Sequence, residues 1–168
     1  MKTHIIAVLA IIFIVFSAHA CKDNATDPSN SIQSEQSLIQ KSTSMSGGTF
    51  VESRKFDDGS PKFEVKIDMP GDGGIVKFEY HMSNGTMREI QGLTSSFDYE
   101  IVPEMGLINY SAAKSIAFNA KNGTVTFWKL QKDESDNMWQ YRFEILSGGT
   151  EWEIRINAVN GTVVRVKS

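Results

Sequence analysis

Hydrophobic and polar residues alternate along the C-terminal stretch 138–166. The hydrophobic positions form three runs with glycine-containing turns between them: Trp139, Tyr141, Phe143 and Ile145, then Trp152, Ile154 and Ile156, then Val164 and Val166. Successive side chains of a β-strand point to opposite faces of the sheet, so this spacing is typical of strands that bury one face. The pattern predicts a three-stranded antiparallel meander.

The N-terminal half shows the same alternation in two consecutive runs: Phe63, Val65, Ile67 and Met69, then Val76, Phe78, Tyr80 and Met82. Turn-forming segments at 57–61 and 70–74 bound these runs. Asn84-Gly85 predicts a tight hairpin before a returning strand over 86–90. With a further strand over 49–56, this half is predicted to contain four strands.

A helix is predicted at the start of each half. The segment 31–45 carries isolated Ile and Leu residues among helix-tolerant polar ones, with Ser31 as a candidate N-cap, and ends before two glycines. The segment 111–121 has an apolar stripe at helical spacing, with Ser111 as N-cap and Asn122-Gly123 as the stop signal. A strand over 124–130 follows it.

The two halves repeat one order of elements, a helix and four strands with an Asn-Gly turn before the last strand. Gly48-Thr49 corresponds to Gly123-Thr124, and Gly85-Thr86 to Gly161-Thr162, so the offset along the chain is nearly constant. We interpret this as an internal duplication. The predicted fold class is α+β, with two tandem units, each one helix packed on a four-stranded antiparallel β-sheet. Unit 1 spans 31–92, a connector spans 93–108, and unit 2 spans 109–168.

Residues 1–20 are predicted to be a secretory signal peptide. Lys2 supplies a positive start, residues 5–16 form a continuous apolar run, and small residues precede Cys21. The run is short for a membrane span, and a retained transmembrane anchor is the alternative. The polar segment 21–30 is predicted to be a tether.

Cys21 is the only cysteine of the chain. The sequence SAHAC resembles the lipobox of bacterial lipoproteins, in which the cysteine receives lipid and becomes the mature N-terminus, although Ala18 stands where leucine is usual. The resemblance implies lipidation of Cys21 and a lipid anchor in the bacterial cell envelope. Ordinary cleavage after Ala20, giving a secreted or periplasmic protein, is the alternative.

Without residues 1–20 the chain keeps 16 basic and 20 acidic residues, a formal charge of −4. This acidity argues against a nucleic-acid partner. His81 and Cys21 are then the only histidine and cysteine, too few for the usual zinc sites or a Cys-His pair. No metal or cofactor is predicted, and the protein is predicted not to be an enzyme.

Residues from about 110 to 168 resemble a PepSY domain, whose pattern places Tyr-x-Phe/Val-x-Ile before a final turn and a valine-rich last strand. Tyr141, Phe143 and Ile145 match the first part, and Ala158, Gly161, Val163 and Val164 match the second. The N-terminal half matches more weakly, since His81 and Met82 replace the Asp-Ala pair of the family pattern.

The resemblance implies a non-catalytic extracytoplasmic module, because PepSY domains occur in propeptides of secreted zinc peptidases and in bacterial envelope proteins. The expected partner is a peptidase or another envelope or secreted protein. The layout is also similar to that of the beta-lactamase inhibitory protein, which binds its target with a sheet face. Fold by itself does not determine function.

The polar side of the predicted sheets is the candidate partner-binding surface. Lys66, His81, Arg142 and Arg155 are expected on it, at alternate positions of neighbouring strands. Either Phe127 or Trp128 must also face outward, and Trp128 is taken as the candidate anchor. Cross-strand charge pairing on a solvated face, without any partner, is the alternative.

The sequence therefore supports two alternative predictions of function. The first is a binding or inhibitory module that regulates a peptidase through the polar sheet face. The second is a small-ligand-binding envelope lipoprotein with a pocket between helix and sheet or between the two units. A specific interface would favour the first, and a lined cavity the second.

Overall fold

The computed structural model describes residues 33–168 except 72, 95–99 and 134. The predicted signal peptide, Cys21 and the tether over 21–30 lie outside the described residues. In the described part, neither helix is long and apolar enough to cross a membrane.

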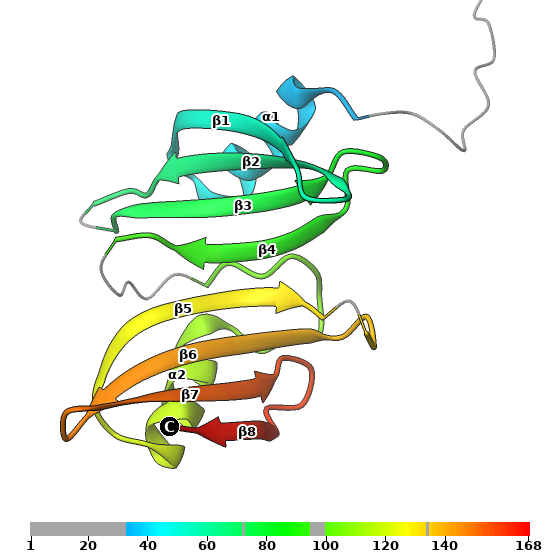
Figure 1. Ribbon diagram of the computed structural model, residues 1–168. Coiled ribbons are helices and arrows are strands. Elements are labelled where there is room, and N and C mark those ends of the chain that lie inside the picture. Colours follow the sequence, from blue (N-terminus) through cyan, green and yellow to red (C-terminus); the bar gives the residue numbers. More distant parts are fainter. Residues whose placement is uncertain (1–32, 72, 95–99, 134) are drawn as a thin grey trace, which may run out of the picture.

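Helix, four strands, helix and four strands follow one another along the chain (Figure 1). The N-terminal half contains α1 (Glu35–Ser46), β1 (Thr49–Asp57), β2 (Pro61–Asp68), β3 (Ile75–His81) and β4 (Met87–Gly92). The C-terminal half contains α2 (Tyr110–Ala120), β5 (Thr124–Lys132), β6 (Trp139–Ser147), β7 (Thr150–Asn157) and β8 (Val163–Lys167). The α+β class and the predicted order of elements are confirmed.

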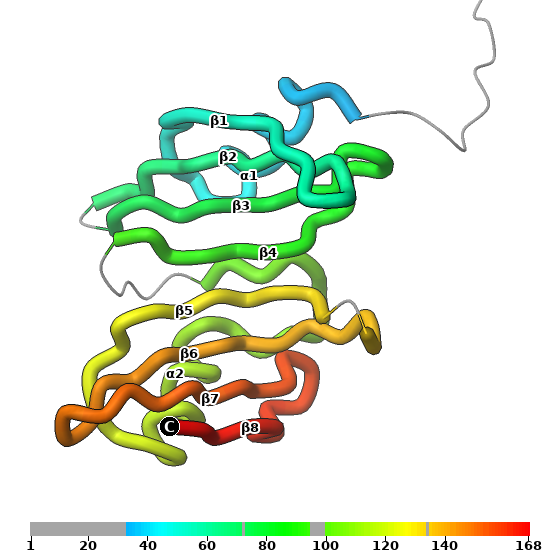
Figure 2. The backbone as a smooth tube through the Cα atoms, in the orientation of Figure 1, coloured from blue at the N-terminus to red at the C-terminus, as the bar shows by residue number. Residues whose placement is uncertain are grey.

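The eight strands form one antiparallel sheet in the order β1 to β8, in place of the two four-stranded sheets predicted. β4 and β5 pair at its centre through Glu89 with Gln131, Ile90 with Leu130, and Gln91 with Lys129. We call this pairing the seam. Figure 2 shows the two strands side by side although α2 lies between them along the chain. Pairing occurs because each strand satisfies backbone hydrogen-bonding groups that the other would leave exposed.

Both helices cover the same face of the sheet. An apolar row crosses six strands in register and is fully buried, and its members are Val65, Phe78, Ile90, Leu130, Tyr141 and Ile156. Paired residues of neighbouring strands point to one face, so the apolar face is continuous across the seam. α1 packs on β1 and β2, and α2 on β6, β7 and β8, both behind the sheet in Figure 1. The other face is called the polar face below.

The helices begin at residues other than those predicted. Ser34 is the N-cap of α1, in place of Ser31, and its side chain accepts a hydrogen bond from the backbone N–H of Ser37. Asn109 is the N-cap of α2, in place of Ser111, which lies within the first turn. Serine and asparagine are both favourable caps, so the pattern alone did not rank neighbouring candidates.

The two halves share backbone irregularities at corresponding places. The register shifts by one residue at Val51 of β1 and at Thr126 of β5. It shifts again at Arg88 of β4 and at Val164 of β8. Each shift is a β-bulge, in which one extra residue interrupts the alternation of faces. The bulge at Arg88 brings its side chain to the polar face, where it reaches Glu79.

Candidate functional site

Two rows of like-charged side chains cross the polar face, one in each half. Glu64, Glu79 and Glu89 lie opposite one another on β2, β3 and β4, and we call them the carboxylate row. Arg142, Arg155 and Arg165 lie opposite one another on β6, β7 and β8, and we call them the arginine row. Like charges directly opposite one another are unfavourable, so each row needs countercharges.

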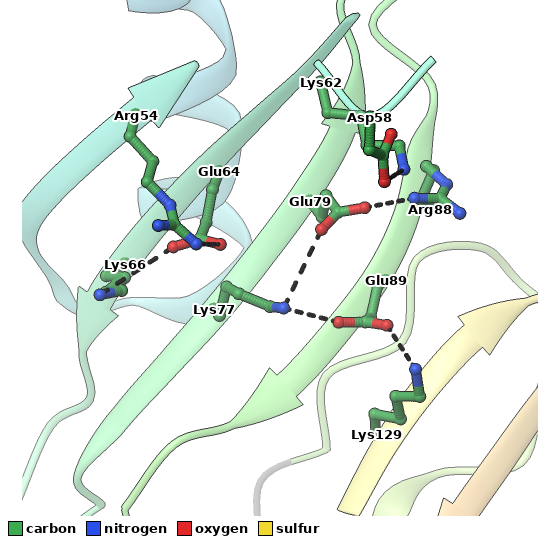
Figure 3. Close-up of polar contacts among 10 residues, drawn as sticks. All are labelled: Arg54, Asp58, Lys62, Glu64, Lys66, Lys77, Glu79, Arg88, Glu89 and Lys129. Atoms are coloured by element: carbon green, nitrogen blue, oxygen red, sulfur yellow. Dashed lines mark hydrogen bonds and ion pairs between the residues drawn. The ribbon is translucent and has the colours of Figure 1, made fainter. Parts of the chain in front are cut away.

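Basic side chains from the same and neighbouring strands surround the first two members of the carboxylate row (Figure 3). Glu64 lies 3.1 Å from the guanidinium of Arg54 and 3.9 Å from the ammonium of Lys66. Glu79 accepts a hydrogen bond from Arg88. The side chains of Glu64 and Glu79 are only 4% and 9% exposed. These two carboxylates are therefore neutralised within the protein and largely withdrawn from solvent.

Glu89 joins the two halves across the seam. Its carboxylate lies 2.7 Å from Lys77 of β3 and 2.9 Å from Lys129 of β5, as Figure 3 shows. Burial alone would raise the pKa of Glu89, but the hydrogen bonds from these two lysines outweigh it and hold the pKa below its usual value. The charged form of Glu89 therefore stabilises the contact between the halves.

The arginine row meets fewer countercharges. The Nε atoms of Arg142, Arg155 and Arg165 lie 3.1, 2.9 and 3.2 Å from the carboxylate of Glu153, which the three arginines share. Arg142 also pairs with Glu144. The three arginine side chains are 30%, 26% and 42% exposed. The row thus presents accessible positive charge.

The three guanidinium groups lower the pKa of Glu153. Burial acts to raise the pKa of Glu153, but the hydrogen bond from Arg155 and the charges of Arg142 and Arg165 lower it below its usual value. Glu153 therefore stays ionised at neutral pH. Its single negative charge lies among three positive ones, so the surface keeps a local positive excess.

The structure places the predicted surface residues at two sites. Arg142 and Arg155 lie together in the arginine row, beside Arg165, which the sequence reasoning did not select although it alternates with Val164 and Val166. Lys66 lies in the other half, 2.6 Å from Glu52, where its charge is offset.

His81 lies apart from the arginine row, at the end of β3 opposite Lys62. It lines a cavity of about 350 Å³ at the hairpin end of the sheet, together with Arg88 and Asp133. The predicted residues thus form no single cluster.

Trp128 does not face outward, which corrects the choice of Trp128 as the anchor. It is 6% exposed, and its ring centre lies 4.6 Å from that of Tyr110 beneath α2. Phe127 lies instead on the polar face, where its ring centre is 5.5 Å from the guanidinium carbon of Arg142. The bulge at Thr126 sets which of the two aromatic residues turns inward, and simple alternation could not decide this.

A polar cavity of about 590 Å³ lies at the hairpin end of the seam. Its lining combines the β1–β2 turn with residues of β4 and β5, and includes Asp58, Lys62, Arg88, Glu89 and Asp133. Both signs of charge are represented. Asp58 and Lys62 pair with each other, whereas Arg88 and Glu89 pair with Glu79 and Lys77, which lie outside the lining. The cavity lies between the two halves, one of the two places predicted for a small-ligand pocket.

The described residues contain no group of three or more His, Cys, Asp or Glu side chains placed to hold a metal ion.

Residues 107–167 match the PepSY family model, described as peptidase propeptide and YPEB domain. The match covers α2 and all four strands of the C-terminal half, β5 to β8. It confirms the resemblance recognised for the C-terminal half. Domains of this family are typically non-catalytic.

No curated protein matches the chain. Among solved structures, the chain is similar to the crystal structure of a putative lipoprotein from Clostridium difficile 630, with 19% sequence identity and a TM-score of 0.39. That alignment covers 83% of this chain and 98% of the other.

Proposed function

We propose that the protein is a non-enzymatic, extracytoplasmic binding module that docks another protein on the polar face of its sheet, with the arginine row at the centre of the contact. The observation that carries this proposal is the exposure of Arg142, Arg155 and Arg165 in register, with Glu153 shared among them. Arginine is enriched at the energetic centres of protein interfaces because its planar group makes several directed hydrogen bonds.

The charge of this surface indicates an acidic partner. In the carboxylate row each glutamate has its own basic neighbours, so little net charge reaches the surface. In the arginine row the positive excess is accessible, and a carboxylate of the partner could form a bidentate pair with a guanidinium. Phe127 beside Arg142 adds an apolar contact at the same place.

A peptidase is the proposed partner class. The match of residues 107–167 to a peptidase-propeptide domain supports it, because propeptides contact the peptidases they accompany. In this proposal the protein restrains its partner by covering it with the sheet.

The N-terminal half is proposed to be a second PepSY-like unit, with boundaries at 31–92 and 109–168 and a connector over 93–108. The paired bulges of β1 and β5 and of β4 and β8 support it. Gly48 and Gly123 also correspond, because a Cβ atom at either would overlap a backbone oxygen of the neighbouring strand.

Attachment of the protein to the bacterial cell envelope is proposed to use lipid on Cys21, with 21–30 as the tether. The propeptide match supports an extracytoplasmic location, since propeptides of this type belong to secreted peptidases. Mass spectrometry of the purified native protein tests the anchor, because lipidated Cys21 adds the mass of acyl chains. Ordinary cleavage after Ala20 would leave a free thiol instead.

A small polar ligand is the second candidate function. The cavity of about 590 Å³ at the seam favours it, because the cavity lies between the halves and is lined by charged groups of both signs. Asp58, Lys62 and Arg88 of the lining already have ion-pair partners within the protein, which favours the protein-docking proposal over this one.

The docking proposal is tested by capture from the native envelope fraction on immobilised mature chain. The test variant carries Arg142→Gln, Arg155→Gln and Arg165→Gln, and the matched control carries Lys41→Gln, Lys114→Gln and Lys121→Gln on the helix side. Both variants lose three positive charges, so any nonspecific electrostatic capture should fall by the same amount in the two variants. A difference between them therefore reports the arginine row.

The expected result is an acidic protein retained by the wild type and the control and lost by the arginine variant. If that protein is a peptidase, its activity should fall when wild-type protein is added and should not fall with the arginine variant. Retention by all three proteins would place the interface elsewhere. Thermal unfolding of each variant establishes that it remains folded.

A further inference from the structure

β8 and β4 are corresponding strands with different surroundings. Each is the last strand of its half and follows a turn with a glycine at positive φ, Gly85 at 67° and Gly161 at 73°. Each contains a bulge, at Arg88 and at Val164. β4 is paired on both sides, whereas β8 ends the strand order of the described sheet and all five of its residues are exposed.

The seam shows how β5 is held against the edge of β4, the strand that corresponds to β8. Ile90 of β4 and Leu130 of β5 lie opposite one another on the apolar face and are fully buried. On the polar face Lys129 of β5 reaches Glu89 of β4 at 2.9 Å. Backbone pairing is thus combined with one apolar contact toward the helix side and one ion pair on the other side.

β8 repeats this arrangement with the charges reversed. In the N-terminal half Lys77 of β3 pairs with Glu89 of β4 at 2.7 Å. At the corresponding places of the C-terminal half, Glu153 of β7 pairs with Arg165 of β8 at 3.2 Å. Val166 takes the place of Ile90 and is 47% exposed. A strand added beside β8 would need an acidic side chain directed at Arg165 to reproduce the contact that Lys129 makes to Glu89.

We propose that β8 binds an extended segment of a partner protein as a ninth antiparallel strand. The segment alternates apolar and acidic residues, with an apolar side chain opposite Val166 on the helix side and Asp or Glu directed at Arg165 on the polar face. Backbone hydrogen bonds of the strand edge supply affinity, and the two side-chain positions supply selectivity. This surface is the edge of the sheet, and it goes beyond the face contact proposed above.

The edge chemistry argues against β1 of a second copy of the chain as the occupant. β1 corresponds to β5 in the repeat, and Gly48-Thr49 aligned with Gly123-Thr124 places Arg54 where Lys129 stands and Lys55 where Leu130 stands. A second copy would therefore direct Arg54 at Arg165 and set a lysine opposite Val166. Charged residues at these positions oppose edge-to-edge association of strands.

The probe for the test is a synthetic peptide with the sequence of residues 124–132 and Lys129→Glu, compared with the same peptide carrying the native Lys129. Binding to the full chain is measured by fluorescence anisotropy. Wild-type protein should bind the Glu peptide about tenfold more tightly than the Lys peptide, since attraction to Arg165 replaces repulsion. The Arg165→Glu protein should reverse this preference.

Two further variants separate the edge from the face. Val166→Lys should abolish binding of the Glu peptide, because a lysine on the helix side blocks the edge. Arg142→Gln with Arg155→Gln should leave peptide binding within about twofold while weakening capture by the polar face. If only the strand-addition proposal fails, peptide binding is lost and capture on the polar face remains. If only the face-docking proposal fails, capture is lost and peptide binding remains.

Equal binding of both peptides, no binding of either, or an unchanged preference in Arg165→Glu would overturn the proposal. Analytical ultracentrifugation of the protein alone tests whether β8 pairs with a second copy of the chain. Dimers that disappear in Val166→Lys would assign the edge to a second copy and overturn the proposal as well.

Discussion

The carboxylate row and the arginine row occupy corresponding places in the two halves but differ in sign and in exposure. Glu79 and Glu89 of the first half correspond to Arg155 and Arg165 of the second. The carboxylates are almost buried, whereas Arg165 is 42% exposed. Both halves keep a continuous apolar face beneath them.

The difference shows how corresponding positions of one sheet can be enclosed by a neighbouring strand in one half and exposed in the other. Glu89 has a basic partner on each side because β5 covers the edge of β4. Arg165 has Glu153 on one side, and β8 is covered by no further strand of the described sheet. The side chains of the seam hold the halves together, whereas the equivalent side chains of β8 are exposed.

The largest expected contrast lies in the apolar positions of β4 and β8. Ile90→Ala should destabilise the protein by about 3 kcal/mol, because it leaves a cavity in a fully buried contact across the seam. Val166→Ala should change the free energy of unfolding by less than about 1 kcal/mol, since Val166 is half exposed. Urea unfolding of the two variants measures the difference. Equal losses would mean that the seam contributes no more stability than the outer edge.

A second contrast concerns the charged positions. Glu89→Gln should cost about 2 kcal/mol, because it leaves Lys77 and Lys129, both mostly buried, without their shared countercharge. Arg165→Gln should cost no more than about 0.5 kcal/mol, as expected for an exposed ion pair. The same unfolding measurement applies. A larger loss for Arg165→Gln would contradict the view that the carboxylate row contributes more to stability than the arginine row.

A third prediction tests whether the halves are equivalent on their helix sides. The hydroxyl of Tyr80 lies 2.8 Å from that of Ser42 on α1, and the hydroxyl of Tyr141 donates to the backbone oxygen of Ile108 at 3.0 Å. Replacement of either tyrosine by phenylalanine should cost about 1 kcal/mol, the usual net value of one hydrogen bond. Thermal unfolding should show similar shifts. Strongly unequal shifts would show that the helices are anchored differently.

Tyr80 also has a spectroscopic signature. Burial raises its pKa to about 12, although the hydrogen bond with Ser42 acts in the opposite direction. Because the folded pKa lies above the ordinary value of 10, the associated stability is complete below pH 10 and is lost as pH rises toward 12. Ultraviolet titration of wild type against Tyr80→Phe isolates this late transition.

The smallest expected effect is on acid stability. The pKa of Glu89 is held below its ordinary value of 4.5, so its contribution is complete above that pH and is lost as pH falls through the lower folded value. Glu89→Gln should therefore lose less stability than wild type between pH 6 and pH 3. Glu153→Gln should differ less from wild type, because the arginines paired with Glu153 are more exposed than the lysines paired with Glu89, so solvent screens these interactions. Unfolding midpoints across this range test both, and parallel curves for all three proteins would contradict the assignment.

Much of the fold could be predicted from local sequence patterns. Alternation identified the strands, and the order of turns identified the halves, because side-chain direction along a strand depends only on neighbouring residues. The same alternation placed Arg142 and Arg155 on the polar face. It could not place Trp128, since the bulge at Thr126 changes the alternation within β5.

The sequence by itself determined the order of helices and strands, the apolar side of the strands and the positions of the charged residues on the opposite side. Only the tertiary structure decided that β4 and β5 join the halves into one sheet, that Glu89 is shared across this seam, and that Glu153 serves three arginines. The physical reason is that alternation is a property of one strand, whereas pairing and register arise between strands distant along the chain.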